Sequence, residues 1–258
     1  MYIDKRMIYI VMAIMLVTGL ASYFSEPGRL LDLLLTIPGL LIAITFHEYA
    51  HAYAADKLGD DTPRLQGRLT LNPLGHLDPI GSIMLLFAGF GWGKPVEVNP
   101  RNYDRRFSMD KADAIVSIAG PLMNFFIVII FTCVYMTIIR VQNIPVSIIN
   151  GVIHLNLEGI SIIERIIISM IEAGIGINLG LGLFNLIPLP PLDGSKVVKP
   201  FLPYNAKVWF ENNEKIIEMI FIALFVFRIL GHIISPVINT VLSGVLKLGF
   251  AIFGIPIN

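Results

Sequence analysis

The sequence contains a single cysteine, Cys133, so an intrachain disulfide and a zinc-thiolate site are both excluded. Charged residues make up only 15% of the chain and balance to a net charge of zero, which gives no indication of nucleic-acid binding. No polar stretch is long enough to form a separate soluble domain. What the chain has instead is 55% hydrophobic residues and a mean hydropathy of +0.74, values typical of a membrane protein.

Hydrophobic runs predict an all-α polytopic membrane protein with about six membrane-spanning helices, since one span needs about 20 mostly apolar residues. The expected spans are 7–24, 30–58, 112–139, 162–186, 216–229 and 233–253. Lys5 and Arg6 precede the first run, which favours a signal-anchor helix over a cleaved signal peptide. In the fourth run, Gly176 and Gly180 have the spacing that lets another helix approach closely.

The region between the second and third spans contains two shorter features. Residues 80–90 are apolar but too few to cross a bilayer, which predicts a re-entrant or buried segment. Residues 92–99 combine glycine and proline with a short alternation, which favours a strand or β-hairpin. Basic residues concentrate in loops 57–111 and 194–215, whereas Arg140 is the only Lys or Arg in loop 140–160. This bias predicts cytoplasmic termini, with the basic stretch 101–111 facing membrane lipid.

Residues 47–51 read His-Glu-Tyr-Ala-His inside an apolar run. On a helix, residues four apart lie on the same face, so His47 and His51 can reach one metal ion. Glu48 can then act as general base on a water at that metal, as in zinc hydrolases. In soluble proteins such a pair is often an ordinary surface or buried pair. Here, ionisable groups in an apolar segment are costly unless something pairs them, which favours a metal.

A catalytic zinc takes three protein ligands and leaves one position open, so a third ligand is needed. The metzincin pattern is not met, since positions 54 and 57 are Ala and Lys rather than Gly and His. After Glu48 the next glutamate is Glu97, and we expect Asp60 and Asp61 to lie in an exposed turn. Asp193 ends a proline-rich run, which makes it a candidate ligand or an ordinary helix-end aspartate.

Two motifs together resemble the site-2 protease family of intramembrane zinc metalloproteases. They are His-Glu-x-x-His at 47–51 and Asn-x-x-Pro-x-Pro-x-Leu-Asp-Gly at 185–194, and a third element of the family is similar to Gly-Pro-x-x-Asn at 120–124. The resemblance covers roughly residues 30–195. It implies one zinc ion per chain bound by His47, His51 and Asp193, with Glu48 as the base. It also implies that the substrates are membrane-spanning proteins cut in regulated intramembrane proteolysis.

The resemblance is to the compact subgroup of that family. The chain has no recognisable PDZ insertion or nucleotide-sensing domain, and it carries the stretch Gly-Arg-Leu-Thr-Leu-Asn-Pro at 67–73. We expect a single membrane-embedded metalloprotease domain over 1–258, with a catalytic core at about 30–195 and accessory helices at 7–24 and 212–253. Its expected location is the cell (plasma or inner) membrane, with the active site toward the cytoplasm.

Several further polar residues could serve the site or only the fold. Asn124 lies in the middle of a span, where its amide could donate to the oxyanion or bridge helices, and the resemblance favours catalysis. For Asn178 and Asn185 the two interpretations stay open, with Asn185 a candidate to position the proline-rich turn. His76 could contact substrate or anchor its loop.

Other functions remain as alternatives. A zinc or divalent-cation transporter could use the same ligands, but it would have no use for Glu48 as a base. An inactive scaffold is disfavoured because ligands and base are all present, and a different membrane zinc hydrolase is disfavoured by the element around Asp193. If the chain is a protease, residues 92–99 could bind an extended substrate peptide by β-augmentation.

Overall fold

The computed structural model describes residues 13–14, 16–21, 27–88, 93–149, 152–227 and 229–257, and most of them are helical. The long helices are α2 (Pro27–Lys57), α5 (Met109–Val141), α6 (Ile162–Asn185), α8 (Tyr204–Val226) and α9 (Ile229–Ile252). The shorter ones are α3 (Thr62–Leu65), α4 (Pro79–Ala88) and α7 (Asp193–Val198), with 3-10 turns η1 (Pro73–Gly75), η2 (Pro100–Asn102) and η3 (Lys199–Phe201).

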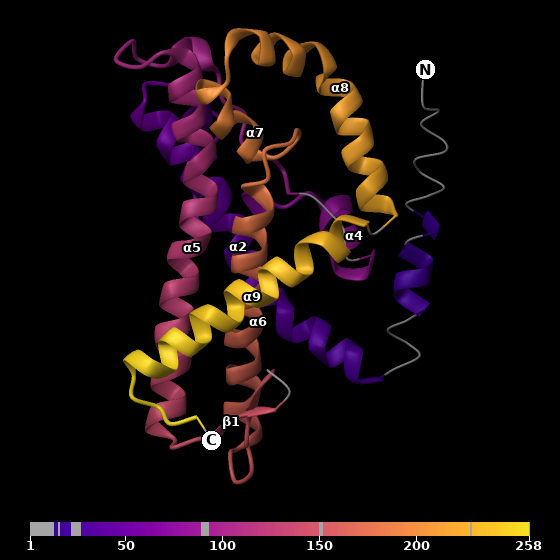
Figure 1. Ribbon diagram of the computed structural model, residues 1–258, viewed down its shortest axis with the longest axis vertical. Coiled ribbons are helices and arrows are strands. Elements are labelled where there is room, and N and C mark those ends of the chain that lie inside the picture. The colour runs from indigo at the N-terminus through magenta and orange to yellow at the C-terminus, as the bar shows by residue number, and fades with distance from the viewer. Residues whose placement is uncertain are drawn as a thin grey trace.

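Helices α2, α5 and α6 pack against one another and form the centre of the molecule (Figure 1). Their backbones approach closely at positions occupied by glycine, which has no side chain to hold the helices apart. A Cβ atom on Gly39 of α2 would lie 2.7 Å from the Cα atom of Gly174 on α6, and one on Gly174 would collide with the Phe131 ring of α5. Among the described residues, no helix approaches closely at Gly176 or Gly180 as predicted. A Cβ on Gly176 would meet none of them within 4 Å, and one on Gly180 would make only an ordinary contact with Ile238, at 3.7 Å.

Helix α9 crosses α5 and α6 obliquely (Figure 1). It packs on them through an apolar cluster whose buried members include Tyr135, Met136, Ile168, Ile175 and Phe250. Gly249 gives α9 its close contact with α5, since a Cβ there would lie 2.7 Å from the Met136 side chain. The main hydrophobic core therefore lies between these three helices.

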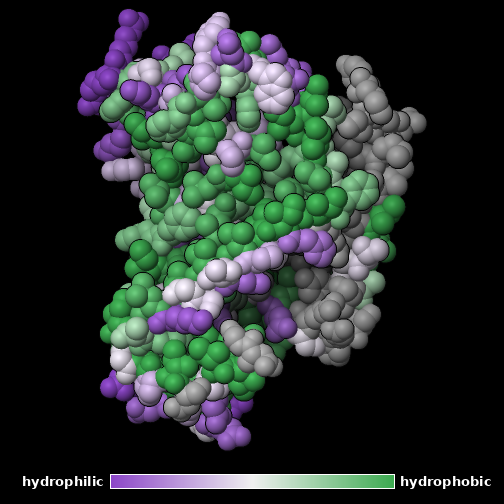
Figure 2. All heavy atoms as spheres, in the orientation of Figure 1, coloured by the Kyte–Doolittle hydropathy of each residue, from purple (hydrophilic) through white to green (hydrophobic). Residues whose placement is uncertain are grey.

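Within the described residues, four helices are long and apolar enough to cross a membrane: Leu30–Lys57, Met109–Val141, Ile162–Asn185 and Ile229–Ile252. Figure 2 shows a broad apolar surface over the middle of the molecule, crossed by a diagonal band of hydrophilic residues, with further hydrophilic residues at both ends. The chain is thus a multi-pass membrane protein, and the predicted count of six spans is not confirmed. The first expected span lies mostly outside the described residues, which are helical at 13–14 and 16–21.

The predicted fifth span, 216–229, is part of a longer and more polar helix. Helix α8 begins at Tyr204, and its first half carries Lys207, Glu211, Glu214 and Lys215. Its second half is mostly apolar but contains Glu218, so the continuously apolar run, 219–226, has less than half the length that a span requires. Helix α4, at 10 residues, is likewise too short to cross a bilayer, as expected for residues 80–90.

The predicted β-hairpin at 92–99 is wrong for the described residues of that segment. Residues 94–99 form no strand, and Gly93 alone makes a bridge, with Leu77. Pro95 has no N–H group, and the N–H of Val96 donates to a side chain instead of a neighbouring strand. The hairpin that is present pairs β1 (Val146–Ile149) with β2 (Val152–Leu155), between α5 and α6. It lies at the opposite end of the bundle from α7 (Figure 1).

Candidate metal centre

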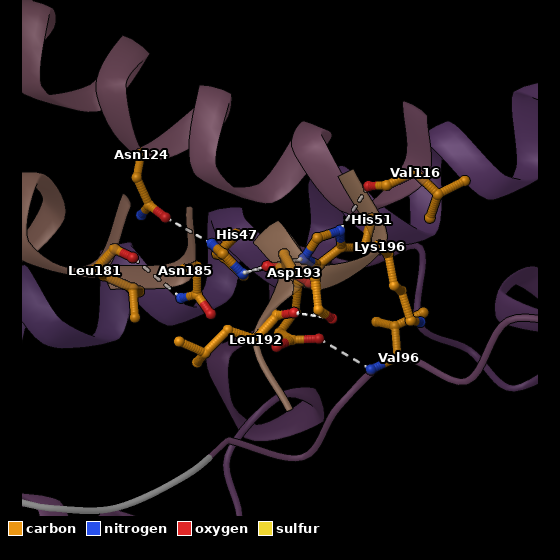
Figure 3. Close-up of polar contacts among 12 residues, drawn as sticks. His47, His51, Val96, Val116, Asn124, Leu181, Asn185, Leu192, Asp193 and Lys196 are labelled. Atoms are coloured by element: carbon orange, nitrogen blue, oxygen red, sulfur yellow. Dashed lines mark hydrogen bonds and ion pairs between the residues drawn. The ribbon is translucent and has the colours of Figure 1, made fainter. Parts of the chain in front are cut away.

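Two imidazoles and one carboxylate converge where α2, α5 and α7 meet (Figure 3). His47 and His51 lie one turn apart on α2, and Asp193 begins α7. Oδ2 of Asp193 lies 3.1 Å from Nε2 of His47 and 3.3 Å from Nε2 of His51. The two Nε2 atoms are 3.0 Å apart. The three side chains each offer one ligand atom, and these atoms lie within 4.8 Å of one another.

The outer nitrogen of each imidazole is held by an oxygen of α5. Nδ1 of His51 lies 2.7 Å from the carbonyl oxygen of Val116, and Nδ1 of His47 lies 2.6 Å from Oδ1 of Asn124. Because these oxygens accept, each Nδ1 carries the hydrogen and each Nε2 presents a lone pair to the centre. Two lone pairs and a carboxylate oxygen then face one another, an arrangement that a shared cation stabilises. Nitrogen and oxygen donors of this kind suit zinc.

Helix α5 approaches the two imidazoles through Gly120. A Cβ atom at this position would lie 2.7 Å from Nε2 and Cε1 of His47, and it would collide with Nε2 of His51. Any larger residue would therefore fill the space where the ligand atoms meet. The absent side chain leaves room for an ion between α2, α5 and α7.

The end of α6 and the turn after it carry Asp193 to the site. Asn185 donates from Nδ2 to the carbonyl oxygen of Leu181 at 3.0 Å, within its own helix. Gly194 is confined as well, because a Cβ there would collide with the backbone carbonyls of Leu186 and Ile187. The tight packing of this turn fixes where α7 begins and so where its first carboxylate lies.

Glu48 occupies the position between the two predicted ligands on α2. Its Oε2 atom accepts a hydrogen bond from the backbone N–H of Val96 at 2.9 Å. No hydrogen bond from the described residues reaches Oε1. One oxygen is therefore fixed by the protein, and the other is available for proton transfer.

Asn124 and Asn178 form a fully buried amide pair behind His47. While Oδ1 of Asn124 faces His47, its Nδ2 donates to the carbonyl oxygen of Ala43 and to Oδ1 of Asn178, both at 3.1 Å. Asn178 in turn donates to the carbonyl oxygen of Gly174 at 2.8 Å. Both amide hydrogens of Asn124 are thus in use, so donation to an oxyanion, which stays a prediction, would require one of these bonds to break.

Two residues outside the centre bear on the surrounding loop. His76 is fully buried and lies 2.8 Å through Nε2 from the carbonyl oxygen of Thr70, a contact that anchors the loop. Asp60, expected in an exposed turn, is 0% exposed, because the segment around Asn99 and Asn102 folds over it. The sequence carried one signal of this structural role. An aspartate often accepts a hydrogen bond from the backbone N–H two residues later, as Asp60 does from Thr62, and so caps its own turn.

Comparisons with known proteins agree with this geometry. The model of peptidase family M50 matches residues 35–228 of the chain. A Bacillus subtilis protein named "Putative zinc metalloprotease YwhC" is 36% identical over 214 residues, covering 83% of this chain and 90% of that protein. Proteins named "Putative zinc metalloprotease Rip2" are also similar. The Mycolicibacterium smegmatis protein is 32% identical over 100 residues (38% of each chain), and the Mycobacterium tuberculosis protein is 26% identical over 172 residues (65% of this chain, 57% of that one). No solved structure matches.

Proposed function

Because this chain belongs to peptidase family M50, the site-2 protease family of zinc metalloproteases, we propose that it hydrolyses peptide bonds of membrane-spanning proteins. In this proposal His47, His51 and Asp193 hold the zinc ion and Glu48 is the general base. The observation that carries it is the convergence of three ligand atoms within 4.8 Å, with both imidazoles held by oxygens through Nδ1.

The surrounding residues prepare the site for hydrolysis. Zinc, when bound, supplies a Lewis acid that lowers the pKa of water from ~15.7 to ~7 and polarises the scissile carbonyl. The Oε1 atom of Glu48 takes a proton from the attacking water and returns it to the leaving amine, while the Val96 N–H holds Oε2. Asn124 acts on His47, whose Nδ1 hydrogen it binds, and thereby keeps Nε2 aimed at the ion.

A substrate helix must unwind before its peptide bonds can reach such a site, because the carbonyls of a helix are hydrogen-bonded internally. The segment 93–99 runs beside Glu48 in a non-helical form. Its position supports the hypothesis that an extended substrate peptide pairs with it. The proposed metal centre lies near a polar end of the bundle, which the basic loops predict to be cytoplasmic. Water can therefore reach it from that side.

Replacing Glu48 with Gln tests the proposal and separates proteolysis from cation transport. We would co-express a panel of single-span membrane proteins with wild-type chain, Glu48→Gln and the control Glu158→Gln, which changes an exposed residue in the turn between β2 and α6. Wild type and the control should release the cleaved fragment of a substrate, and Glu48→Gln should release none while retaining zinc. Fragment that still forms in Glu48→Gln would refute the assignment of the base.

A further inference from the structure

The segment 93–99 is fastened to the rest of the molecule through three backbone N–H groups. Lys94 donates to the carbonyl oxygen of His76 at 2.8 Å, and Asn99 donates to Oδ2 of Asp60 at 2.6 Å. Between them Val96 donates to Oε2 of Glu48 at 2.9 Å. The segment is thus tied down on both sides of its contact with the proposed base.

The Asp60 carboxylate is the anchor on the side of Asn99, and it is completely buried. Besides Oδ2, its Oδ1 accepts from the Thr62 hydroxyl at 2.5 Å, from the Thr62 N–H at 3.2 Å and from Nδ2 of Asn102 at 2.9 Å. Burial raises the pKa of this carboxyl, but the hydrogen bonds outweigh burial and bring the pKa below its usual range. Both oxygens therefore act as acceptors of an ionised group, a role that an amide cannot reproduce.

The register of the segment decides which residue faces Glu48. Asp60 follows the last turn of the helix that carries Glu48, so the two carboxylates are fixed relative to each other. If the segment moved by one residue, Pro95 or Glu97 would take the place of Val96. Pro95 has no N–H to donate, and Glu97 would bring a second negative charge to the base. Only the observed register supplies an N–H group without these penalties.

We propose that Asp60 is a positioning residue for catalysis: it sets the register of segment 93–99, so that the Val96 N–H holds Oε2 of Glu48. The inference rests on the proposed role of Glu48 as the base. Asp60 touches neither the metal ligands nor a reacting atom, and it acts through the backbone of Asn99 and Val96.

Asp60→Asn and its neighbour Asp61→Asn form the matched pair for the test. The full chain, loaded with zinc in detergent, is compared by amide hydrogen exchange and by kinetics on a membrane protein that wild type cleaves. In Asp60→Asn the Val96 amide should exchange at least about 10-fold faster, because its segment loses an anchor. The kcat should fall by on the order of 10- to 100-fold, because the base is misplaced, and KM, which reports on pairing of the substrate with the segment, should change less than kcat. Zinc content should not change, and Asp61→Asn should behave as wild type.

Asn102→Ala provides a milder variant on an exposed residue, which keeps the test decisive should Asp60→Asn fail to fold. It removes one donor to Asp60, and we expect the same changes at a few-fold magnitude. Wild-type exchange of the Val96 amide in these variants, or an unchanged kcat, would overturn the inference. A fall in stability with kcat intact would show a purely structural role, which also overturns it.

Failure of the proposed function would look different. Cleavage that persists in Glu48→Gln would refute the assignment of Glu48 as the base. The exchange rate of the Val96 amide, in contrast, reports on the anchoring role of Asp60 without any substrate. Fast exchange in Asp60→Asn together with an active Glu48→Gln would therefore leave the anchoring role and refute the catalytic one.

Discussion

Gly120→Ala tests whether the space between α2, α5 and α7 is a metal site. The added Cβ would lie 2.7 Å from His47 Nε2 and Cε1 and would collide with His51 Nε2. Ordinary contact begins at 3.4 Å, so the His47 ring must withdraw by about 0.7 Å. Zinc–ligand distances hold only within about 0.2 Å, so at least one ligand atom is displaced beyond what the site tolerates.

The expected loss of zinc affinity is at least about 100-fold, which corresponds to about 2.7 kcal/mol. Overpacking should also lower the free energy of unfolding by about 1–3 kcal/mol. Zinc affinity is measured by competition with a chelator of known affinity, on protein whose folding is checked by thermal unfolding. Gly176→Ala is the matched control: Gly176 lies in α6, another membrane helix, and its added Cβ would meet none of the described residues within 4 Å.

Two results would refute the reasoning. If Gly120→Ala binds zinc within about threefold of wild type, the ion does not lie between these side chains, whatever the activity. If Gly176→Ala loses zinc to the same extent, the effect belongs to glycine replacement in membrane helices in general. The expected pattern is loss of zinc in Gly120→Ala alone.

Three further outcomes are expected. Asn178→Ala should lower zinc affinity by about 10-fold, since Asn124 loses an acceptor and holds His47 less firmly, and an unchanged chelator competition would contradict this. The pKa of Asp60 is lower in the folded state than its unfolded value of about 3.9, so ionised Asp60 stabilises the fold above that pH, and this contribution is lost as pH falls through the folded pKa. The difference in free energy of unfolding between zinc-free wild type and Asp60→Asn should therefore shrink below pH ~4. A difference that widens there would contradict the lowered pKa. Gly174→Ala should destabilise the bundle by about 1–3 kcal/mol through its collision with the Phe131 ring, as thermal unfolding against Gly176→Ala would show.

Local patterns predicted the helix that carries the imidazoles and the ends of three spans. Hydrophobic runs at 30–58, 112–139 and 162–186 correspond to α2, α5 and α6 within about three residues. Helix α5 begins earlier than its apolar run because Ser108 has an N-cap conformation and Asp110 lies in the first turn. Hydropathy predicts the part of a helix that lies in lipid, whereas capping determines where the helix begins.

Properties that depend on contacts distant in sequence were not predictable in this way. Asp60 lies in a polar turn, and its burial comes from Asn99 and Asn102, about forty positions later. Segment 93–99 has the alternation of a strand, but its N–H groups go to Asp60, to Glu48 and to the carbonyl of His76. The contact between α2 and α6 at Gly174 was likewise hidden, because the spacing of Gly176 and Gly180 fitted the general pattern better.

The geometry of the site depends most on α5, a helix that carries none of the three proposed ligands. Val116, Gly120 and Asn124 are spaced by four and form one stripe along α5. The ends of the stripe hold His51 and His47, and the middle leaves the space between them. Since the two helices run in opposite directions, the repeat of α5 matches the repeat of α2, and sliding one helix by a single residue, ~1.5 Å, would break both hydrogen bonds together. The tautomers of the imidazoles therefore depend on how far α2 and α5 are shifted relative to each other along their axes. The tight contacts of Gly39, Gly174 and Phe131 help to fix this position.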